Sequence, residues 1–245
     1  MAFRWCPRRL ESAGWLLRSN GGMNIVFDLG AVLLTWEPVV LVQAHLGAHA
    51  PTAEGAHALA RDMFHHEDWL GFDRGTHPLD VAIGLMATRL GLPADKLDAL
   101  LAPMGERLAP IAVTVELLKG LRQRRDAGEA LKLYYLSNMP VPYARALERR
   151  MSFLQWFDGG IFSGDVKLLK PQREIYALLA DRFVLKPQMT VFIDDSRANV
   201  DAARAFGWHA VHCESPTALP EQLARQMTAL SGTTGDRCHD VNRRI

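Results

Sequence analysis

Short apolar runs alternate along most of the chain with segments whose apolar residues recur at helical spacing. The helical segments include Val113, Leu117 and Leu121, the stretch 143–150, and Val200, Ala203 and Phe206 before Gly207. Strands alternating with helices are typical of an α/β domain, in which a parallel sheet with right-handed crossovers is flanked by helices. Runs rich in β-branched, leucine and aromatic residues predict buried strands at 24–27, 131–136, 161–162, 190–193 and 209–212.

The stretch from residue 37 to residue 110 breaks this alternation, because its apolar residues follow helical spacing throughout. A helical block of this length between the first and second strands exceeds an ordinary crossover. We therefore predict a helical cap inserted after the first strand, covering 37–110, with the core formed by 23–36 and 111–230. Its expected helices carry Val39, Val40, Val42 and Leu46; Ile83, Met86, Ala87 and Leu90 before Gly91; and Leu97, Leu100 and Leu101 after Pro93.

The two ends of the chain lack such a pattern. Residues 1–22 are basic and irregular, and residues 231–245 are polar, so we expect a disordered leader and a disordered tail. The first strand follows Met23 at once, which suggests that Met23 is the biological start. The alternative, a genuine but loosely ordered extension, is equally compatible with the sequence.

Composition narrows the class of protein further. Hydrophobic residues make up 49% of the 245 residues and the formal net charge is +1, so no charge pattern indicates a nucleic-acid or membrane partner. No apolar run reaches the roughly 20 residues of a membrane span. The 3 cysteines are scattered and fit a reducing compartment, so we expect a cytoplasmic protein, as a monomer or homodimer.

Polar residues follow the predicted strands at the carboxyl edge of the sheet, where open α/β sheets place their chemistry. Taken singly, each has an ordinary explanation as a helix cap or a solvated side chain. Together they bring several carboxylates and one cation toward a single crevice. The residues are Asp28, Ser137, Asn138, Ser163, Asp165, Asp194 and Asp195, with Lys170 shortly after the third strand.

Three carboxylates, Asp28, Asp194 and Asp195, repel one another unless a cation compensates them. Carboxylates, a backbone carbonyl and water are the ligands that Mg²⁺ prefers. Lys170 and the Ser137 hydroxyl would add donors for an anion beside the metal. This set favours phosphoryl transfer to a carboxylate nucleophile.

Four segments in this order resemble the motifs of the haloacid dehalogenase superfamily. They are Phe-Asp-Leu-Gly-Ala-Val-Leu at 27–33, Leu-Ser-Asn at 136–138, Lys-Pro-x-x-x-Ile-Tyr at 170–176, and Phe-Ile-Asp-Asp-Ser-x-x-Asn-Val at 192–200. Within the superfamily the chain is most similar to subfamily IA, variant 3, which includes phosphatases similar to sugar-1-phosphate phosphatases and to the phosphatase domain of soluble epoxide hydrolase. The resemblance implies a Rossmann-like core, a helical cap, an Asp nucleophile that becomes phosphorylated, and Mg²⁺.

The resemblance also implies a role for each matching residue. Asp28 matches the nucleophile and metal ligand, and Gly30 the metal-binding carbonyl. Asp195 matches the direct metal ligand of the last motif, Asp194 an indirect ligand, and Asn199 a position that is often aspartate. Ser137, Asn138 and Lys170 match the groups that hold the phosphoryl group and balance its charge.

Gly30 is where the chain departs from the family pattern. Most phosphatases of the superfamily carry Asp two places after the nucleophile, where it protonates the leaving alcohol and then activates water. This position is Gly30, so the usual acid/base is missing. We therefore expect a phosphatase of small phosphorylated metabolites, with sugar phosphates of good leaving group favoured, or one that uses a proton donor from the cap.

Two alternatives remain open. A 2-haloacid dehalogenase needs neither leaving-group acid nor metal, but relatives of that type usually carry Ser-Asn residues in place of the pair Asp194-Asp195. A non-catalytic binding protein is also compatible with the loss at Gly30.

The cap should set substrate choice by closing over the nucleophile. Adjacent helical side chains point about 100° apart, so His65 and His66 make a poor metal pair. Trp36 and Trp69 suit either stacking on a sugar or packing between core and cap. The other polar or aromatic candidates are Glu37, His45, Asp68, Asp73 and Arg74.

Overall fold

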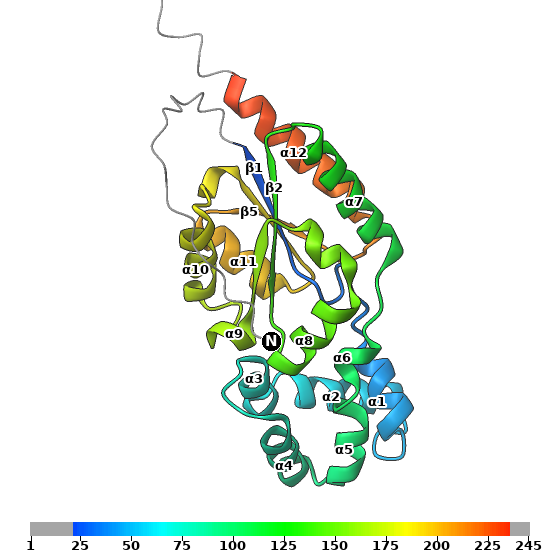
Figure 1. Cartoon of the computed structure of the whole chain (residues 1–245). Coiled ribbons are helices and arrows are strands. Elements are labelled where there is room, and N and C mark those ends of the chain that lie inside the picture. The colour runs from blue at the N-terminus through cyan, green and yellow to red at the C-terminus, as the bar shows by residue number, and fades with distance from the viewer. Residues whose placement is uncertain (1–21, 236–245) are drawn as a thin grey trace, which may run out of the picture.

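A computed structural model describes residues 22–235, with side chains up to Ser231. The predictions for residues 1–21 and 236–245 lie outside this part of the chain. Helices cover both faces of one sheet, and a further group of helices lies at one end of it (Figure 1). The strands are β1 Met23–Phe27, β2 Leu131–Ser137, β3 Gly159–Phe162, β4 Thr190–Asp194 and β5 His209–His212. The helices are α1 Pro38–Leu46, α2 Ala53–Phe64, α3 Glu67–Asp73, α4 Leu79–Leu90, α5 Ala94–Leu101, α6 Met104–Arg107, α7 Ala112–Asp126, α8 Val141–Arg150, α9 Ser163–Val166, α10 Arg173–Phe183, α11 Arg197–Phe206 and α12 Leu219–Gly235, with short 3₁₀ turns at Ser152–Trp156 and Pro187–Met189.

The sheet has the order β3-β2-β1-β4-β5, and all neighbouring strands run parallel. Phe27 pairs with Tyr135 of β2 on one side and with Ile193 of β4 on the other. The carboxyl ends of these three central strands therefore lie together. The predicted α/β class, with a parallel sheet between helices, is confirmed.

Alternating side chains of the central strand pack into two separate cores. Ile25 and Phe27 belong to a cluster with residues of α7, α8 and α12, whereas Val26 packs with residues of α10 and α11. Successive side chains of a strand point to opposite faces, so a fully apolar run is what a strand covered on both faces requires.

Helices α1 to α6 lie together beyond the carboxyl edge of the sheet (Figure 1). The chain enters and leaves this group side by side, since Thr35 N donates to Ala109 O at 2.8 Å and Ile111 N to Leu33 O at 2.9 Å. The regular structure between residues 38 and 107 is helical throughout, in agreement with the predicted helical block. The division into core and cap domains remains a prediction.

Three details of the helices differ from the sequence prediction. Val40 is 53% exposed and Val113 is 37% exposed, although both were expected on buried faces. In α7 the buried face is Thr114, Leu118 and Leu121, because the Thr114 hydroxyl donates to Val32 O at 2.6 Å and is satisfied inside the protein. Helix α12 continues to Gly235, past residue 231, where the sequence predicts the tail to begin.

Gly207 ends α11 as predicted, with φ at 104°, a conformation that a residue with a side chain rarely adopts. Among the described residues no helix is long and apolar enough to cross a membrane.

Candidate active site

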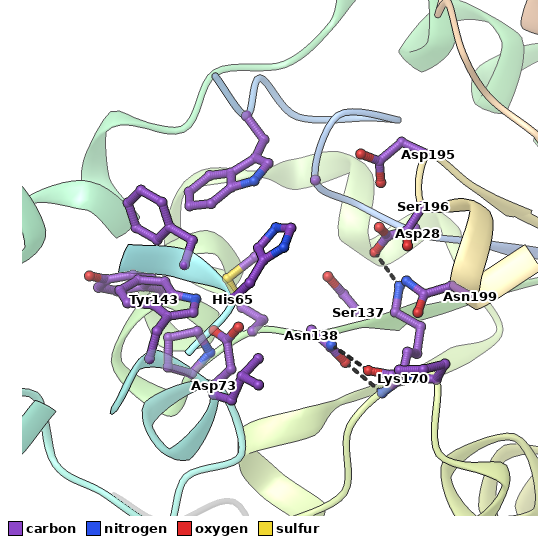
Figure 2. Close-up of a pocket in the computed structure, with 18 of the residues that line it drawn as sticks. Asp28, His65, Asp73, Ser137, Asn138, Tyr143, Lys170, Asp195, Ser196 and Asn199 are labelled. Carbon is purple, nitrogen blue, oxygen red and sulfur yellow. Dashed lines mark hydrogen bonds and ion pairs between the residues drawn. The ribbon is translucent and has the colours of Figure 1, made fainter. Parts of the chain in front are cut away.

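The predicted site residues meet at the carboxyl edge of the sheet, around one cavity of about 380 Å³. Asp28 follows β1 and Ser137 ends β2, while Asp194 ends β4 and Asp195 follows it. Figure 2 shows Asp28 and Asp195 on one side of the pocket, opposite His65, Asp73 and Tyr143. Asp28, Gly30, Ser137, Asn138, Lys170, Asp195 and Asn199 all line this cavity.

A buried ammonium group joins two of the three carboxylates. Lys170 is 4% exposed, and its Nζ lies 2.9 Å from Asp28 Oδ1 and 2.6 Å from Asp194 Oδ2. Burial by itself lowers the pKa of Lys170, but the carboxylates of Asp194 and Asp28 outweigh it and hold the pKa above its usual range. Lys170 therefore stays charged and fixes one side of Asp28.

Both oxygens of Asp194 are already engaged. Oδ2 accepts from Lys170, and Oδ1 accepts from Ser196 N at 2.8 Å and from Asn199 Nδ2 at 2.9 Å. Asp194 thus holds the Lys170 ammonium group in place, and each of its oxygens already accepts at least one hydrogen bond. The indirect metal role of Asp194 stays a prediction, and Asn199 orients its carboxylate.

One oxygen from each of Asp28, Asp194 and Asp195 lies within 4.8 Å of the others. Burial raises the pKa of Asp28 and of Asp195, and the neighbouring carboxylates add to this effect. With all three carboxyl groups ionised, Lys170 would offset only one of the negative charges. The donor set therefore suits a divalent cation with hard oxygen ligands, such as Mg²⁺.

Asn138 lines the cavity, but its side-chain amide is bonded to the backbone of Lys170. Its Nδ2 donates to Lys170 O at 3.0 Å, and its Oδ1 accepts from Lys170 N at 2.9 Å. The amide therefore holds the backbone of Lys170, which leaves the buried Ser137 hydroxyl and the backbone at residue 138 free to face an anion.

Ser163 and Asp165 do not join the site, contrary to their predicted place at the same edge. The Ser163 hydroxyl donates to Asp73 O at 2.6 Å and accepts from Met139 N at 2.8 Å, so it ties α3 to the core. Asp165 is paired with Arg145 at the surface. A strand-end position alone does not show which way a short polar side chain will point.

The cap side of the cavity is largely aromatic. Trp36 stacks on Trp69 with ring centroids 6.4 Å apart, and Phe64 contacts both rings edge-on. The tryptophans thus pack core against cap and also line the cavity. The sequence prediction missed the other apolar lining residues, whose spacing is that of ordinary core positions: Phe64, Leu70, Met104, Leu108, Met139 and Tyr143.

The polar cap candidates divide into two groups. His65, Asp73 and the indole of Trp69 line the cavity. The others make contacts elsewhere: His66 caps α3 and pairs with Asp68, which also binds Arg89; Arg74 pairs with Glu67; His45 lies beside Arg107; and Glu37 is exposed. His65 and His66 were predicted on one helix but lie between α2 and α3, where only His65 lines the cavity.

Comparison with known proteins identifies the family. The model for haloacid dehalogenase-like hydrolases matches residues 23–207. The chain belongs to this family. The predicted superfamily and hydrolase class are thereby confirmed.

Relatives and solved structures agree with this assignment. A sesquiterpene phosphatase of Aspergillus oryzae is 29% identical over 203 residues, which cover 81% of this chain and 93% of that protein. A phosphorylated carbohydrates phosphatase of Thermotoga maritima is 31% identical over 102 residues, 40% of this chain and 47% of that protein. The fold is shared with a haloacid dehalogenase family enzyme of Bacteroides thetaiotaomicron, solved in complex with magnesium and inorganic phosphate, at a TM-score of 0.58 and 19% identity over 78% of this chain and 94% of that one.

Proposed function

We propose that this protein is a Mg²⁺-dependent phosphatase that hydrolyses a small phosphomonoester through an aspartyl-phosphate at Asp28. The observation that carries the proposal is the buried arrangement of Asp28, Lys170 and Asp194, in which Asp28 and Lys170 line the cavity. A charged lysine locked between two carboxylates is suited to hold one nucleophilic carboxylate in place beside a phosphate group.

The contacts of Asp28 indicate how it would react. Its Oδ1 accepts from Leu29 N at 2.7 Å and lies 2.9 Å from Lys170 Nζ. Oδ2 is therefore the oxygen available to attack phosphorus, while the Ser137 hydroxyl and Lys170 offer donors to the phosphoryl oxygens. A Mg²⁺ ion held by Asp28, Asp195 and the Gly30 carbonyl would supply further charge compensation on the phosphate.

The residues that line the cavity indicate which kind of organic group the substrate carries. A sugar needs a hydrogen-bond partner for each hydroxyl that loses water, and unpaired polar groups are costly to bury. On the cap side the lining offers aromatic and aliphatic surface, with His65 and Asp73 as its titratable groups besides Tyr143. We therefore propose a phosphate ester with an apolar organic group, of the isoprenoid type, which accords with the name of the Aspergillus relative.

Sugar phosphates, the class predicted from the sequence, remain the second candidate. The partial match to the Thermotoga carbohydrate phosphatase favours them. An isoprenoid group needs apolar surface on the cap side of the cavity, whereas a sugar needs hydrogen-bond partners there. One panel of substrates therefore distinguishes the two candidates.

The test is phosphate release by the purified full chain from isoprenoid monophosphates and sugar phosphates, with Mg²⁺ or with EDTA. We expect Mg²⁺-dependent release, faster from isoprenoid monophosphates, and none from the Asp28→Asn variant. Preferred hydrolysis of sugar phosphates would select the second candidate.

Halide release from 2-haloacids in EDTA, without phosphatase activity, would instead favour a dehalogenase. Inactivity in both assays would favour a binding protein. Full activity of the Asp28→Asn variant would refute the assigned nucleophile.

A further inference from the structure

In the proposed reaction, the ester oxygen that leaves phosphorus has to receive a proton. Phosphoryl transfer proceeds with the attacking and leaving oxygens roughly in line. With Asp28 attacking from the core side, the leaving oxygen must lie on the far side of phosphorus, toward the cap. Gly30 carries no side chain that could protonate it.

Three titratable side chains line the cavity from that far side: His65, Asp73 and Tyr143 (Figure 2). The Tyr143 hydroxyl donates to Leu101 O at 2.5 Å, and burial raises its pKa far above neutrality. His65 is exposed, so its position is set by few neighbours. Asp73 is only 8% exposed, and Figure 2 shows its carboxyl group turned toward the pocket.

The backbone of Asp73 is hydrogen-bonded to the core. Its carbonyl accepts from the Ser163 hydroxyl at 2.6 Å, and that hydroxyl accepts in turn from Met139 N. Two residues later the chain comes so close to α9 that a Cβ on Gly75 would lie 2.5 Å from Gly164 O. These contacts hold the end of α3 in register with the loops that follow β2 and β3, as a precisely placed proton donor requires.

We propose that Asp73 is the general acid and base of this enzyme and replaces the carboxyl group missing at Gly30. The inference rests on the proposed phosphatase function, since it assigns a residue to that reaction.

The electrostatic surroundings of Asp73 support this role. Burial raises the pKa of Asp73 to about 7, while a hydrogen bond from Trp69 and the charge of Lys170 lower it and Asp28 raises it slightly. Tyr143 faces it as a neutral phenol. A carboxyl group with a pKa near neutrality is populated in both forms, as an acid that later serves as a base must be.

Asp73 alone can supply the proton needed in the first step and recover one in the second. In the first, Asp28 Oδ2 forms a bond to phosphorus, the bond between phosphorus and the ester oxygen breaks, and that oxygen takes the proton of Asp73 to leave as an alcohol. In the second, water occupies the vacated position, Asp73 removes its proton as it attacks phosphorus, and the bond to Asp28 breaks to release phosphate. Asp73 ends protonated, ready for the next cycle.

The experiment compares two leaving groups in the full-length protein with Mg²⁺. An alkyl monophosphate needs a proton on its leaving oxygen, whereas p-nitrophenyl phosphate does not. For Asp73→Asn we expect alkyl phosphate turnover to fall by about 10²–10⁴-fold, the usual contribution of general acid–base catalysis. With p-nitrophenyl phosphate we expect a rapid burst of one nitrophenolate for each active site and then slow turnover, because the phosphorylated Asp28 lacks its base.

Asp68→Asn is the matched control, because Asp68 is a second buried acid of the same helix but bonds to Arg89, away from the cavity. We expect it to keep the wild-type ratio of the two turnover rates and to show no burst. Circular dichroism and thermal unfolding would establish that each variant is folded.

Several outcomes would overturn the inference. Retained alkyl phosphate turnover in Asp73→Asn would contradict it, as would an equal loss of turnover of both substrates without a burst in a folded variant. The same burst in His65→Gln, with Asp73→Asn behaving as wild type, would assign the role to His65. If instead the wild type hydrolyses neither substrate, or Asp28→Asn remains active, the proposed function itself fails.

Discussion

Replacing Asp73 by Asn should make the protein more stable at alkaline pH. The side chain is buried beside Trp69 and Tyr143, and burial raises its pKa from 3.8 to about 7. An acid whose pKa is higher in the folded than in the unfolded protein favours folding less as pH rises. The wild type therefore loses stability between about pH 4 and pH 7 because the unfolded chain ionises first. Asn has nearly the same shape and does not titrate.

The size of the effect follows from the pKa difference. Each pH unit between the folded and unfolded pKa corresponds to about 1.4 kcal/mol, so the ionisation of Asp73 destabilises the wild type by about 4 kcal/mol at pH 8. At pH 5 the corresponding loss of folding stability is about 2 kcal/mol, because pH 5 lies only a little above the pKa of the carboxyl group in the unfolded chain. Any constant cost of burying an amide cancels between the two conditions. The variant should therefore gain about 2–3 kcal/mol relative to wild type between pH 5 and pH 8.

The assay is urea unfolding followed by circular dichroism for both proteins at pH 5 and pH 8, without Mg²⁺. Ser163→Ala is a suitable control, because it removes the hydroxyl bound to the Asp73 carbonyl without removing the titrating group. Its loss of stability, about 1–3 kcal/mol, should be similar at both pH values. A stability difference between wild type and Asp73→Asn that stays constant with pH, or that shrinks toward pH 8, would refute the reasoning.

Four further changes have defined outcomes. Lys170→Met leaves two buried carboxylates without their cation, so urea unfolding should show a loss of about 3–5 kcal/mol and phosphate release should cease; wild-type stability would contradict this. Gly75→Ala places a Cβ 2.5 Å from a carbonyl oxygen of α9 at a φ of 75°, so unfolding should show a loss of more than about 1 kcal/mol. Trp36→Ala should raise KM for an isoprenoid phosphate about tenfold or more but change KM for methyl phosphate little, as steady-state kinetics would show. Gly30→Asp, whose added Cβ would make only ordinary van der Waals contacts with Trp36, should restore alkyl phosphate turnover to Asp73→Asn.

The sequence was informative wherever structure follows from nearby residues and from the geometry of parallel sheets. Apolar runs gave the strands, and Gly91 and Gly207 ended helices as predicted because glycine adopts positive φ at little cost. Acids at the ends of β1 and β4 had to approach each other, since these strands are neighbours in a parallel sheet. The family motifs therefore pointed to Asp28, Lys170, Asp194 and Asp195 before any coordinates were considered.

Tertiary contacts decided which of two neighbouring residues is buried, a choice that residue spacing leaves open. The buried face of α7 shifted by one residue because Thr114 found an acceptor in Val32 O, which lies 82 positions away in the chain. Tertiary contacts also distinguish Asp194 from Asp195, because Asp194 accepts hydrogen bonds from Lys170 and Asn199.

By itself, the sequence determined the α/β class and predicted the helical block and the acids and lysine at the sheet edge, because these depend on residue periodicity and on the family motifs. The tertiary structure alone decided that Ser163 anchors α3, that aromatic rings from Trp36, Phe64 and Trp69 form one wall, and that Asp73 lies in the cavity opposite Asp28. The physical reason is that a cap helix has to pack against its neighbours and against the core at once. Its own residue spacing does not show which polar side chain will be buried between them.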